Sequence, residues 1–118
     1  MDLVVKGRNG RVPEELKRTA EHKLGKLQRI DPRVVRVEVE LSEERNPRVR
    51  ERERVKVVCR TSKRTFRASG RGDDVEAALD QVVDRLDRQL TRYRGRFRAR
   101  LMAAANRLES ARLARGER

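Results

Sequence analysis

The sequence predicts a single α+β domain with the element order β-α-β-β-β-α, in which two helices cover one face of a four-stranded mixed sheet. Two observations lead to this prediction. Apolar residues recur at helical spacing over residues 13–30 and 73–94, whereas residues 33–41 and 49–60 alternate between apolar and charged side chains, as half-buried strands do. A chain of 118 residues is long enough to bury one modest core.

The first part of the chain provides a strand, a helix and a second strand. Residues 2–8 are rich in β-branched side chains and stop at an Asn-Gly turn signal at 9–10. Pro13 occupies a first helical position, and an Asp-Pro pair at 31–32 ends the helix. Because a helix joins strand 2–8 to strand 33–41, we expect the two strands to be parallel, with a right-handed crossover. The predicted inward-facing side chains are Leu3, Val5, Leu16, Ala20, Leu24, Leu27, Val35, Val37, Val39 and Leu41.

The second part of the chain completes the sheet and adds the longer helix. Residues 49–60 and 65–71 are predicted to be consecutive antiparallel strands. Asp73 and Glu76 form an acidic N-terminal box that opens the helix at 73–94. The predicted inward-facing side chains are Val55, Val57, Cys59, Phe66, Ala68, Gly70, Val75, Leu79, Val82, Val83, Leu86, Leu90 and Tyr93.

The apolar pattern of the second helix continues after Gly95, where it would run beyond the sheet. We expect residues 1–95 to form the domain and residues 96–118 to form a basic helical extension or tail. This extension is either a free basic arm or a contact surface for RNA or another protein. The side chains that continue the pattern are Phe97, Leu101, Ala104 and Leu108.

The charge of the chain points to a polyanionic partner. There are 32 Lys and Arg residues against 19 Asp and Glu, which gives a formal net charge of +13. Arg greatly outnumbers Lys, and its planar guanidinium group suits phosphate. At 100° per residue the basic side chains gather on one edge of each helix, opposite or beside the apolar stripe. These candidate RNA-binding residues are Arg18, His22, Lys26 and Arg29 on the first helix and Arg85, Arg88 and Arg92 on the second.

Several types of site are disfavoured by composition. Cys59 is the single cysteine and His22 the single histidine, which argues against a disulfide, a zinc site or a histidine-dependent catalytic site. Three aromatic residues are too few for a platform that stacks single-stranded bases. Neither a signal sequence nor a membrane-length apolar run is present, so we expect a cytoplasmic protein without a membrane partner.

Four stretches resemble the ribosome hibernation promoting factor and ribosome-associated inhibitor family, over residues 1–95. They are Lys-Gly-Arg-Asn at 6–9, EHKLGKLQRI at 21–30, VVRVEVELS at 34–42 and AALDQVVDRLDRQLTRYR at 77–94. The resemblance implies a fold related to double-stranded-RNA-binding domains. It also implies a non-enzymatic translation inhibitor that occupies the mRNA and tRNA channel of the small ribosomal subunit and promotes hibernation under stress. The implied partner is 16S ribosomal RNA near the decoding region, with no cofactor and no small-molecule substrate.

The basic helix positions of the family correspond here to six residues, and one of them is not on the basic edges identified from the helical wheels. Lys23, at the border of the apolar stripe, is supplied by the resemblance, together with Lys26, Arg29, Arg85, Arg88 and Arg92. Long family members carry a C-terminal dimerisation domain that pairs ribosomes, and nothing in this sequence resembles it. The chain is therefore either a short form or the N-terminal part of a longer protein, and we expect the isolated chain to be a monomer.

Three alternatives concern other surfaces. A nuclease would need clustered carboxylates, and Asp80, Asp84 and Asp87 form the one acidic row of the second helix. A membrane-surface or protein-interaction module would use the apolar stripe after Gly95. The outward row of the third strand is either an ordinary charged face or a secondary contact surface; it comprises Arg50, Arg52, Arg54 and Lys56.

Overall fold

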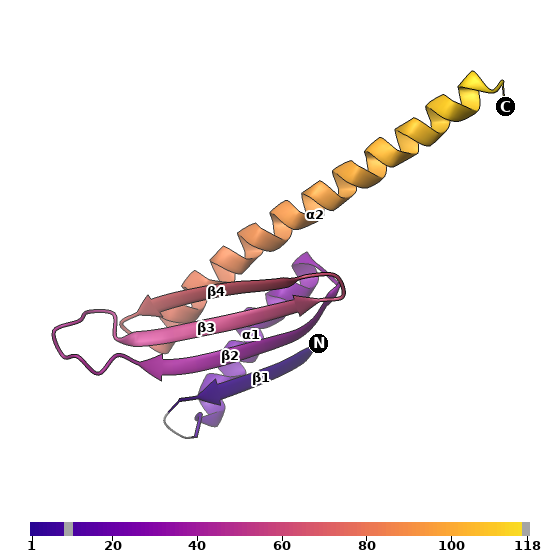
Figure 1. The fold of residues 1–118 in the computed structure, drawn as a ribbon. Helices are drawn as coiled ribbons and strands as arrows, with labels where there is room; N and C mark the ends of the chain where they lie inside the picture. The colour runs from indigo at the N-terminus through magenta and orange to yellow at the C-terminus, as the bar shows by residue number, and fades with distance from the viewer. Residues whose placement is uncertain (9–10, 117–118) are drawn as a thin grey trace.

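The computed structural model describes residues 1–8 and 11–116 and has the predicted element order (Figure 1). The strands pair in the order β1-β2-β3-β4, with β1 parallel to β2 and the other two pairs antiparallel. This confirms the α+β class and the mixed sheet; the predicted turn at 9–10 lies outside the described residues. The elements are β1 (Asp2–Gly7), α1 (Glu14–Ile30), β2 (Val34–Glu43), β3 (Glu53–Thr61), β4 (Thr65–Gly72) and α2 (Val75–Ala114).

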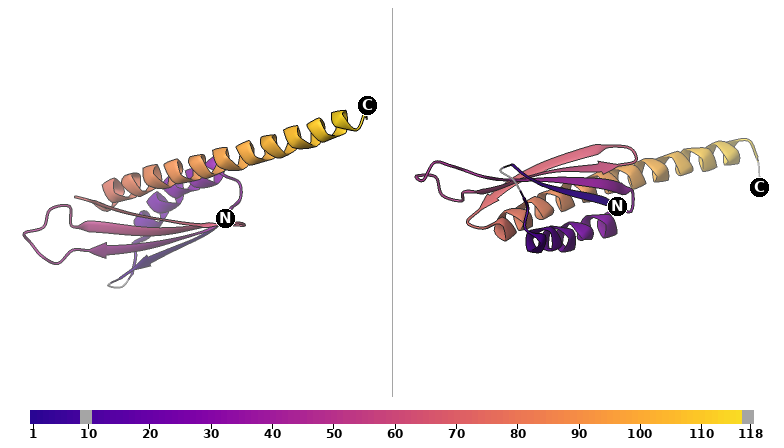
Figure 2. Two further views of the ribbon diagram at one scale, coloured as in Figure 1. Left: turned by 45° about the horizontal axis from the view of Figure 1, so that its top comes forward. Right: turned by 90° about the horizontal axis from the view of Figure 1, so that it is seen from below.

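Both helices pack on the same face of the sheet, and the hydrophobic core lies between them and the strands (Figure 2). The apolar stripes of α1 and α2 supply Leu24, Leu27, Leu79, Leu86 and Leu90 to this core. The inward-facing side chains of the strands complete it, among them Val37, Val39, Val55, Val57, Cys59 and Phe66. Burial raises the pKa of the Cys59 thiol to about 11, which suits a packed core side chain and not a nucleophile.

Two glycines of β4 allow the first turns of α2 to approach the sheet closely. A Cβ atom at Gly70 would lie 2.7 Å from the backbone oxygen of Ala78, and one at Gly72 would lie 2.8 Å from the Cβ of Ala77. Because real Cβ atoms do not come this close, any larger residue would push the helix away. These glycines therefore set the distance between α2 and β4.

Both helices begin slightly later than predicted. Pro13 is the N-cap of α1 and not its first helical residue. The cap of α2 is Asp74 and not Asp73, because the Asp74 side chain accepts a hydrogen bond of 2.7 Å from the backbone N–H of Ala77. The extended backbone of Asp74 is what an N-cap requires, and a sequence with two adjacent aspartates does not reveal which one adopts it.

The inward position at the start of β2 is occupied by Val34, so the prediction for Val35 is wrong. Val34 is buried, whereas Val35 is 51% exposed. The register between β2 and β3 shifts at this point, with Val34 opposite Thr61 and Arg36 opposite Arg60. This bulge places an extra residue in β2 and reverses the alternation for the residues before it.

The third strand begins at Glu53 instead of residue 49, because the preceding residues form a loop. The backbone N–H of Glu44 donates to the carbonyl of Arg52 over 2.7 Å, which closes the loop at its base. Inside it, Asn46 accepts a hydrogen bond from the backbone of Arg48, and Glu51 has a positive φ of 54°. Arg50 and Arg52 therefore lie in this loop and not on the sheet.

The second helix is a single rod of 40 residues that leaves the body of the protein after about residue 94 (Figure 1). We call its projecting part, residues 95–114, the arm. Leu101 is 55% exposed and Leu108 is 68% exposed, so the apolar stripe is uncovered there, as the sequence predicted. The side chain of Phe97 lies outside the described part of the structure. The arm makes the molecule 72 Å long.

A buried carboxylate joins the end of α1 to the sheet. Asp31 is 1% exposed and accepts hydrogen bonds from Nε and Nη2 of Arg33, at 3.0 and 2.9 Å. The hydrogen bonds from Arg33 hold the pKa of Asp31 below its ordinary value. Nearby, Arg94 of α2 donates to the carbonyl of Ile30 over 2.6 Å and so caps the last turn of α1. These contacts fix the relative position of the two helices.

We predict that Asp31→Asn lowers the free energy of unfolding by about 2 kcal/mol at pH 7, because it removes charged hydrogen bonds at a buried site. A depressed folded pKa adds stability above the unfolded value of 3.8, and this stability disappears as the pH falls through the folded pKa. The difference in the free energy of unfolding between the parent chain and the Asp31→Asn variant should therefore become smaller as the pH is lowered. Urea denaturation at pH 7 and pH 2.5 measures it, and an equal difference at both pH values would contradict the prediction.

Candidate nucleic-acid interface

The two helices are joined by a row of ion pairs that we call the seam. Lys23 Nζ lies 2.6 Å from Asp80 Oδ1 and 3.4 Å from Glu76 Oε1, and Lys26 Nζ lies 3.5 Å from Asp87 Oδ2. The hydrogen bond to Asp80 raises the pKa of Lys23 above its ordinary value. Two members of the acidic row of α2, Asp80 and Asp87, thus face α1, which a helical wheel alone does not show. Two of the predicted site lysines contact the protein's own carboxylates.

The other predicted site residues of α1 are exposed to solvent. Arg18, His22 and Arg29 are exposed, and among the described residues no carboxylate forms an ion pair with them. The Lys26 side chain is 53% exposed despite its contact with Asp87. These four residues, which we call the α1 edge, form an accessible row of basic side chains along the first helix.

The basic row of α2, here called the α2 edge, consists of Arg85, Arg88 and Arg92 and lies on the side of β4. Arg85 donates a hydrogen bond to the carbonyl of Ser69, and Arg88 pairs with Asp84 one turn earlier. All three arginines are exposed. They line a shallow groove between α2 and β4, together with Arg67, Ala68, Ser69 and Gln89.

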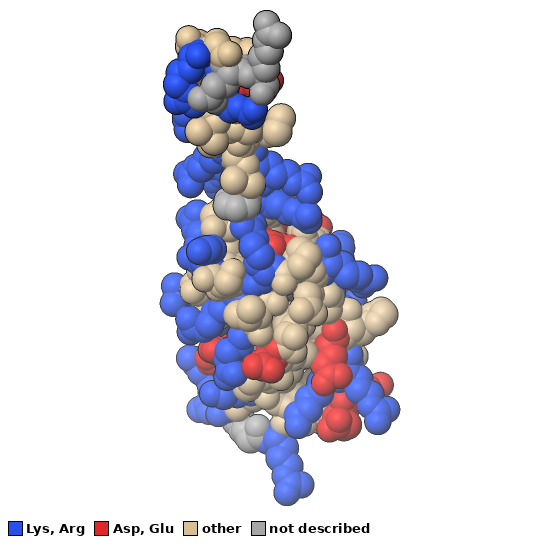
Figure 3. Space-filling model, turned by 90° about the vertical axis from the view of Figure 1, so that its right-hand side faces the viewer, with Lys and Arg blue, Asp and Glu red and all other residues tan. Residues whose placement is uncertain are grey.

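The structure therefore divides the predicted residues into three groups. The α1 edge and the α2 edge both reach solvent, and the seam with Lys23 and Lys26 runs between the two helices. Figure 3 shows Lys and Arg side chains around the projecting helix, whereas most of the visible acidic side chains lie on the body below it. Arg67 belongs to the same groove, but its place on a strand gave the sequence no helical pattern to reveal it.

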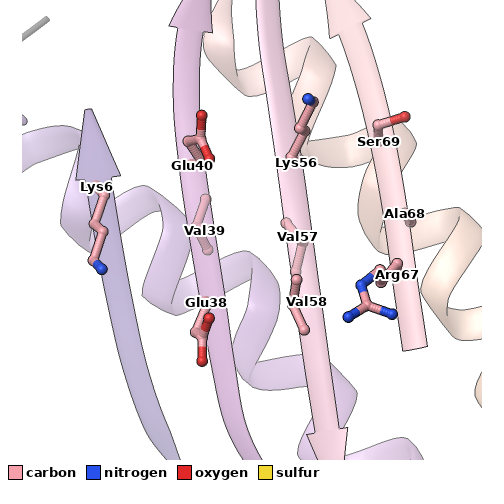
Figure 4. Close-up of a pocket in the computed structure, with 10 residues that line it drawn as sticks. All are labelled: Lys6, Glu38, Val39, Glu40, Lys56, Val57, Val58, Arg67, Ala68 and Ser69. Atoms are coloured by element: carbon pink, nitrogen blue, oxygen red, sulfur yellow. The ribbon is translucent and has the colours of Figure 1, made fainter. Parts of the chain in front are cut away.

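The outer face of the sheet carries charges of both signs (Figure 4). Glu38 of β2 accepts hydrogen bonds from Arg36 at 3.0 Å and Arg60 at 3.3 Å, which hold its pKa below the ordinary value. Glu40 pairs with Arg8 at 3.2 Å. A surface with alternating, locally paired charges attracts a polyanion less than the two helical edges do.

Arg52, in the loop before β3, and Arg54, in β3, are also engaged with carboxylates. Arg52 pairs with Glu43 at 3.4 Å, and Arg54 pairs with Glu44 at 3.3 Å. These contacts connect the loop before β3 to the end of β2. They favour the interpretation of this surface as an ordinary charged face over that of a secondary contact surface.

The three carboxylates considered for a nuclease all have cationic partners. Asp80 and Asp87 bind the lysines of the seam, and Asp84 binds Arg88. Across the part of the chain that the structure describes, no three His, Cys, Asp or Glu side chains converge as metal ligands would. Neither described helix combines the length and hydropathy of a segment that crosses a bilayer.

Comparison with known proteins gives three findings. A family profile described as sigma 54 modulation protein / S30EA ribosomal protein matches residues 3–98. The ribosome hibernation promotion factor of Mycobacterium tuberculosis is 33% identical over 96 residues, which cover 80% of this chain and 44% of that protein. The ribosome hibernation promoting factor of Salmonella typhimurium is 29% identical over 98 residues, which cover 83% of this chain and 98% of that protein.

The fold has a counterpart among solved structures. The crystal structure of the Thermus thermophilus Protein Y N-terminal domain aligns with a TM-score of 0.67 at 26% identity, over 79% of this chain and 99% of that domain. The chain thus spans less than half of the Mycobacterium relative but nearly all of the Salmonella protein and the Thermus domain.

Proposed function

The chain belongs to the sigma 54 modulation protein / S30EA ribosomal protein family, and we propose from this premise that it is a ribosome-associated translation regulator. In this proposal it binds the small ribosomal subunit in the mRNA and tRNA channel, contacts 16S ribosomal RNA near the decoding region, and promotes hibernation under stress. Two curated relatives are named as hibernation factors, which supports the ribosome as its partner. The protein acts in the cytoplasm, by binding and not by catalysis.

The observation that carries the proposal is the placement of the α1 edge and the α2 edge on the helical side of one rigid domain. Guanidinium groups along a helix are spaced by about 5 Å per turn, which is comparable to the spacing of phosphates in a nucleic acid. Contacts of this kind recognise the shape of a folded RNA through its phosphates and sugars. Occupation of the channel then excludes the competing RNAs without any chemical step.

The seam has a positioning role in this proposal. Lys23 and Lys26 hold α2 beside α1 through Asp80 and Asp87, and so fix the separation of the two basic edges. The carboxylates of the seam are neutralised by these lysines, which lowers the repulsion that a nearby phosphate would meet. Lys26 is half exposed and also donates to RNA at the border of the α1 edge.

Binding of the full chain to purified small ribosomal subunits at increasing salt tests the proposal. The expected result is a loss of affinity of roughly 10³- to 10⁵-fold between 50 and 200 mM salt, as for proteins that neutralise six to ten phosphates. As a control, the buffer ion is replaced by another of the same charge while the ionic strength is held constant. Binding that does not depend on salt, or the absence of binding at 50 mM salt, would contradict the proposal.

A second possibility is that this chain is the N-terminal part of a longer hibernation factor that also pairs ribosomes. The Mycobacterium relative supports it, because the chain aligns with 44% of that protein. We expect ribosomes incubated with this chain alone to sediment as single particles in a sucrose gradient. A peak of paired ribosomes would show instead that residues 1–118 are sufficient for pairing.

A further inference from the structure

One row of arginines follows α2 from the body of the protein along the arm, and we call it the arginine rail. Its members fall within about 80° of arc at 100° per residue, on the side of the helix that faces β4. With a rise of 1.5 Å per residue, the rail is about 33 Å long. It consists of Arg85, Arg92, Arg96, Arg100 and Arg107.

Two arginines outside the helix lie beside this rail. Arg67 of β4 lines the groove that also contains Arg85 and Arg92. Arg64, in the β3–β4 turn, lines a second hollow together with Arg96, Arg100 and Tyr93. The guanidinium group of Arg64 lies 5.5 Å from the ring centres of both Phe66 and Tyr93, which holds it in place. The rail is therefore continuous from the sheet edge to the arm.

The rail contains an unusual excess of positive charge. No Asp or Glu occurs in the sequence between Asp87 and Glu109, a stretch that contains seven arginines. Within residues 1–8 and 11–116, none of Arg92, Arg96 and Arg100 forms an ion pair with a carboxylate. Ordinary solvated helices mix charges of both signs, so this segregation favours a polyanionic ligand.

We propose that the arginine rail binds the phosphate backbone of a double-stranded RNA segment that lies beside β4 and the arm. The inference rests on the proposed function, because the duplex would belong to the ribosomal RNA. It extends the contact surface of the α2 edge, which shares Arg85 and Arg92 with the rail, along the arm. A straight rigid row of about 33 Å matches a regular, extended backbone better than a compact loop does. The scarcity of aromatic residues disfavours single strands.

A duplex accounts for the rail better than an anionic membrane does. A membrane-bound helix would insert an apolar face between its basic residues. The part of the rail on the body of the protein has Ala68, Ser69 and Gln89 as its neighbours, and these side chains offer no large apolar surface. The apolar residues Leu101 and Leu108 lie on a different side of the arm, about 130° from the centre of the rail.

Two full-length variants with the same loss of charge test this inference. Arg96→Gln with Arg100→Gln removes two rail residues, and Arg98→Gln with Arg112→Gln removes two arginines about 160° away on the same arm. The probes are a 20-base-pair RNA duplex, purified small ribosomal subunits, and vesicles of phosphatidylserine and phosphatidylcholine. Gln is a good helix former, so both variants should retain the helical circular dichroism of the parent chain.

For the duplex we expect the rail variant to bind about tenfold more weakly at 150 mM salt than the parent chain. The slope of log K against log salt concentration should become shallower by about 1.5. The affinity of the control variant should change by less than twofold. Equal weakening in both variants would refute the rail, as would a loss confined to vesicles. If the parent chain and the rail variant bind subunits equally well, the inference about the rail is wrong, whereas the proposed function still stands. If the parent chain fails to bind subunits, the proposed function itself is wrong.

Discussion

Replacement of Arg85, Arg88 and Arg92 by Glu is expected to abolish co-sedimentation of the chain with small ribosomal subunits. Each arginine is exposed and each charge-assisted contact with phosphate contributes about 1.5 kcal/mol, so three contacts correspond to about 10³-fold in affinity. The repulsion added by three carboxylates increases this loss. The intramolecular partners of these arginines are exposed, so their loss has little effect on folding.

A control with the same change of charge separates a specific surface from general electrostatic attraction. Arg45, Arg48 and Arg50 are exposed residues of the loop between β2 and β3, outside both helical edges. Their replacement by Glu changes the net charge equally and should leave most of the binding at moderate salt. If the α2-edge variant still sediments with the subunits, the proposed contact surface is wrong.

Gly70→Val is expected to produce the largest loss of stability among the substitutions considered, about 3 kcal/mol, at the upper end of the range for an overpacked core. The new Cβ would meet the backbone oxygen of Ala78 at 2.7 Å and Cγ2 of Val82 at 2.9 Å. A backbone atom has no alternative rotamer, so α2 must move away from β4. Urea denaturation of the variant and the parent chain measures the difference.

Glycines of the helices provide the matched comparison. Nothing lies within 4 Å of a Cβ built at Gly95 or Gly25. Ala at either position should therefore stabilise the protein by about 0.5 to 1 kcal/mol, because it reduces the freedom of the unfolded chain. Gly70→Val with unchanged stability would show that the close approach of α2 to β4 does not restrain the fold.

The sequence was sufficient to predict the helices, the strands and the sheet. Each element turns one side towards a single core, and this leaves a regular apolar pattern in the sequence. The apolar stripe from Val75 to Tyr93 identified α2, and the alternation in β2 and β3 identified the antiparallel pair. The predictions failed where one residue changed the register. The bulge at Val35 depends on pairing with β3, and the choice of Asp74 over Asp73 as the cap depends on backbone geometry.

The candidate site was predicted only in part for a related reason. A helical wheel separates the basic and acidic edges of each helix, but it does not show which edge meets the neighbouring helix. Contacts between Lys23 and Asp80, 57 residues apart, arise from the packing of α1 against α2. The same holds for Arg94 and the carbonyl of Ile30. Arg64 and Arg67 join the arginine rail through the position of β4, which no local pattern encodes.

The most direct measurement for the central claim is a cryo-electron microscopy map of this chain bound to the small ribosomal subunit. We predict density in the mRNA and tRNA channel, with Arg85, Arg88 and Arg92 within hydrogen-bonding distance of ribosomal RNA phosphates and the α1 edge on the same RNA surface. A map in which the chain binds outside the channel, or in which both helical edges face solvent, would contradict the account.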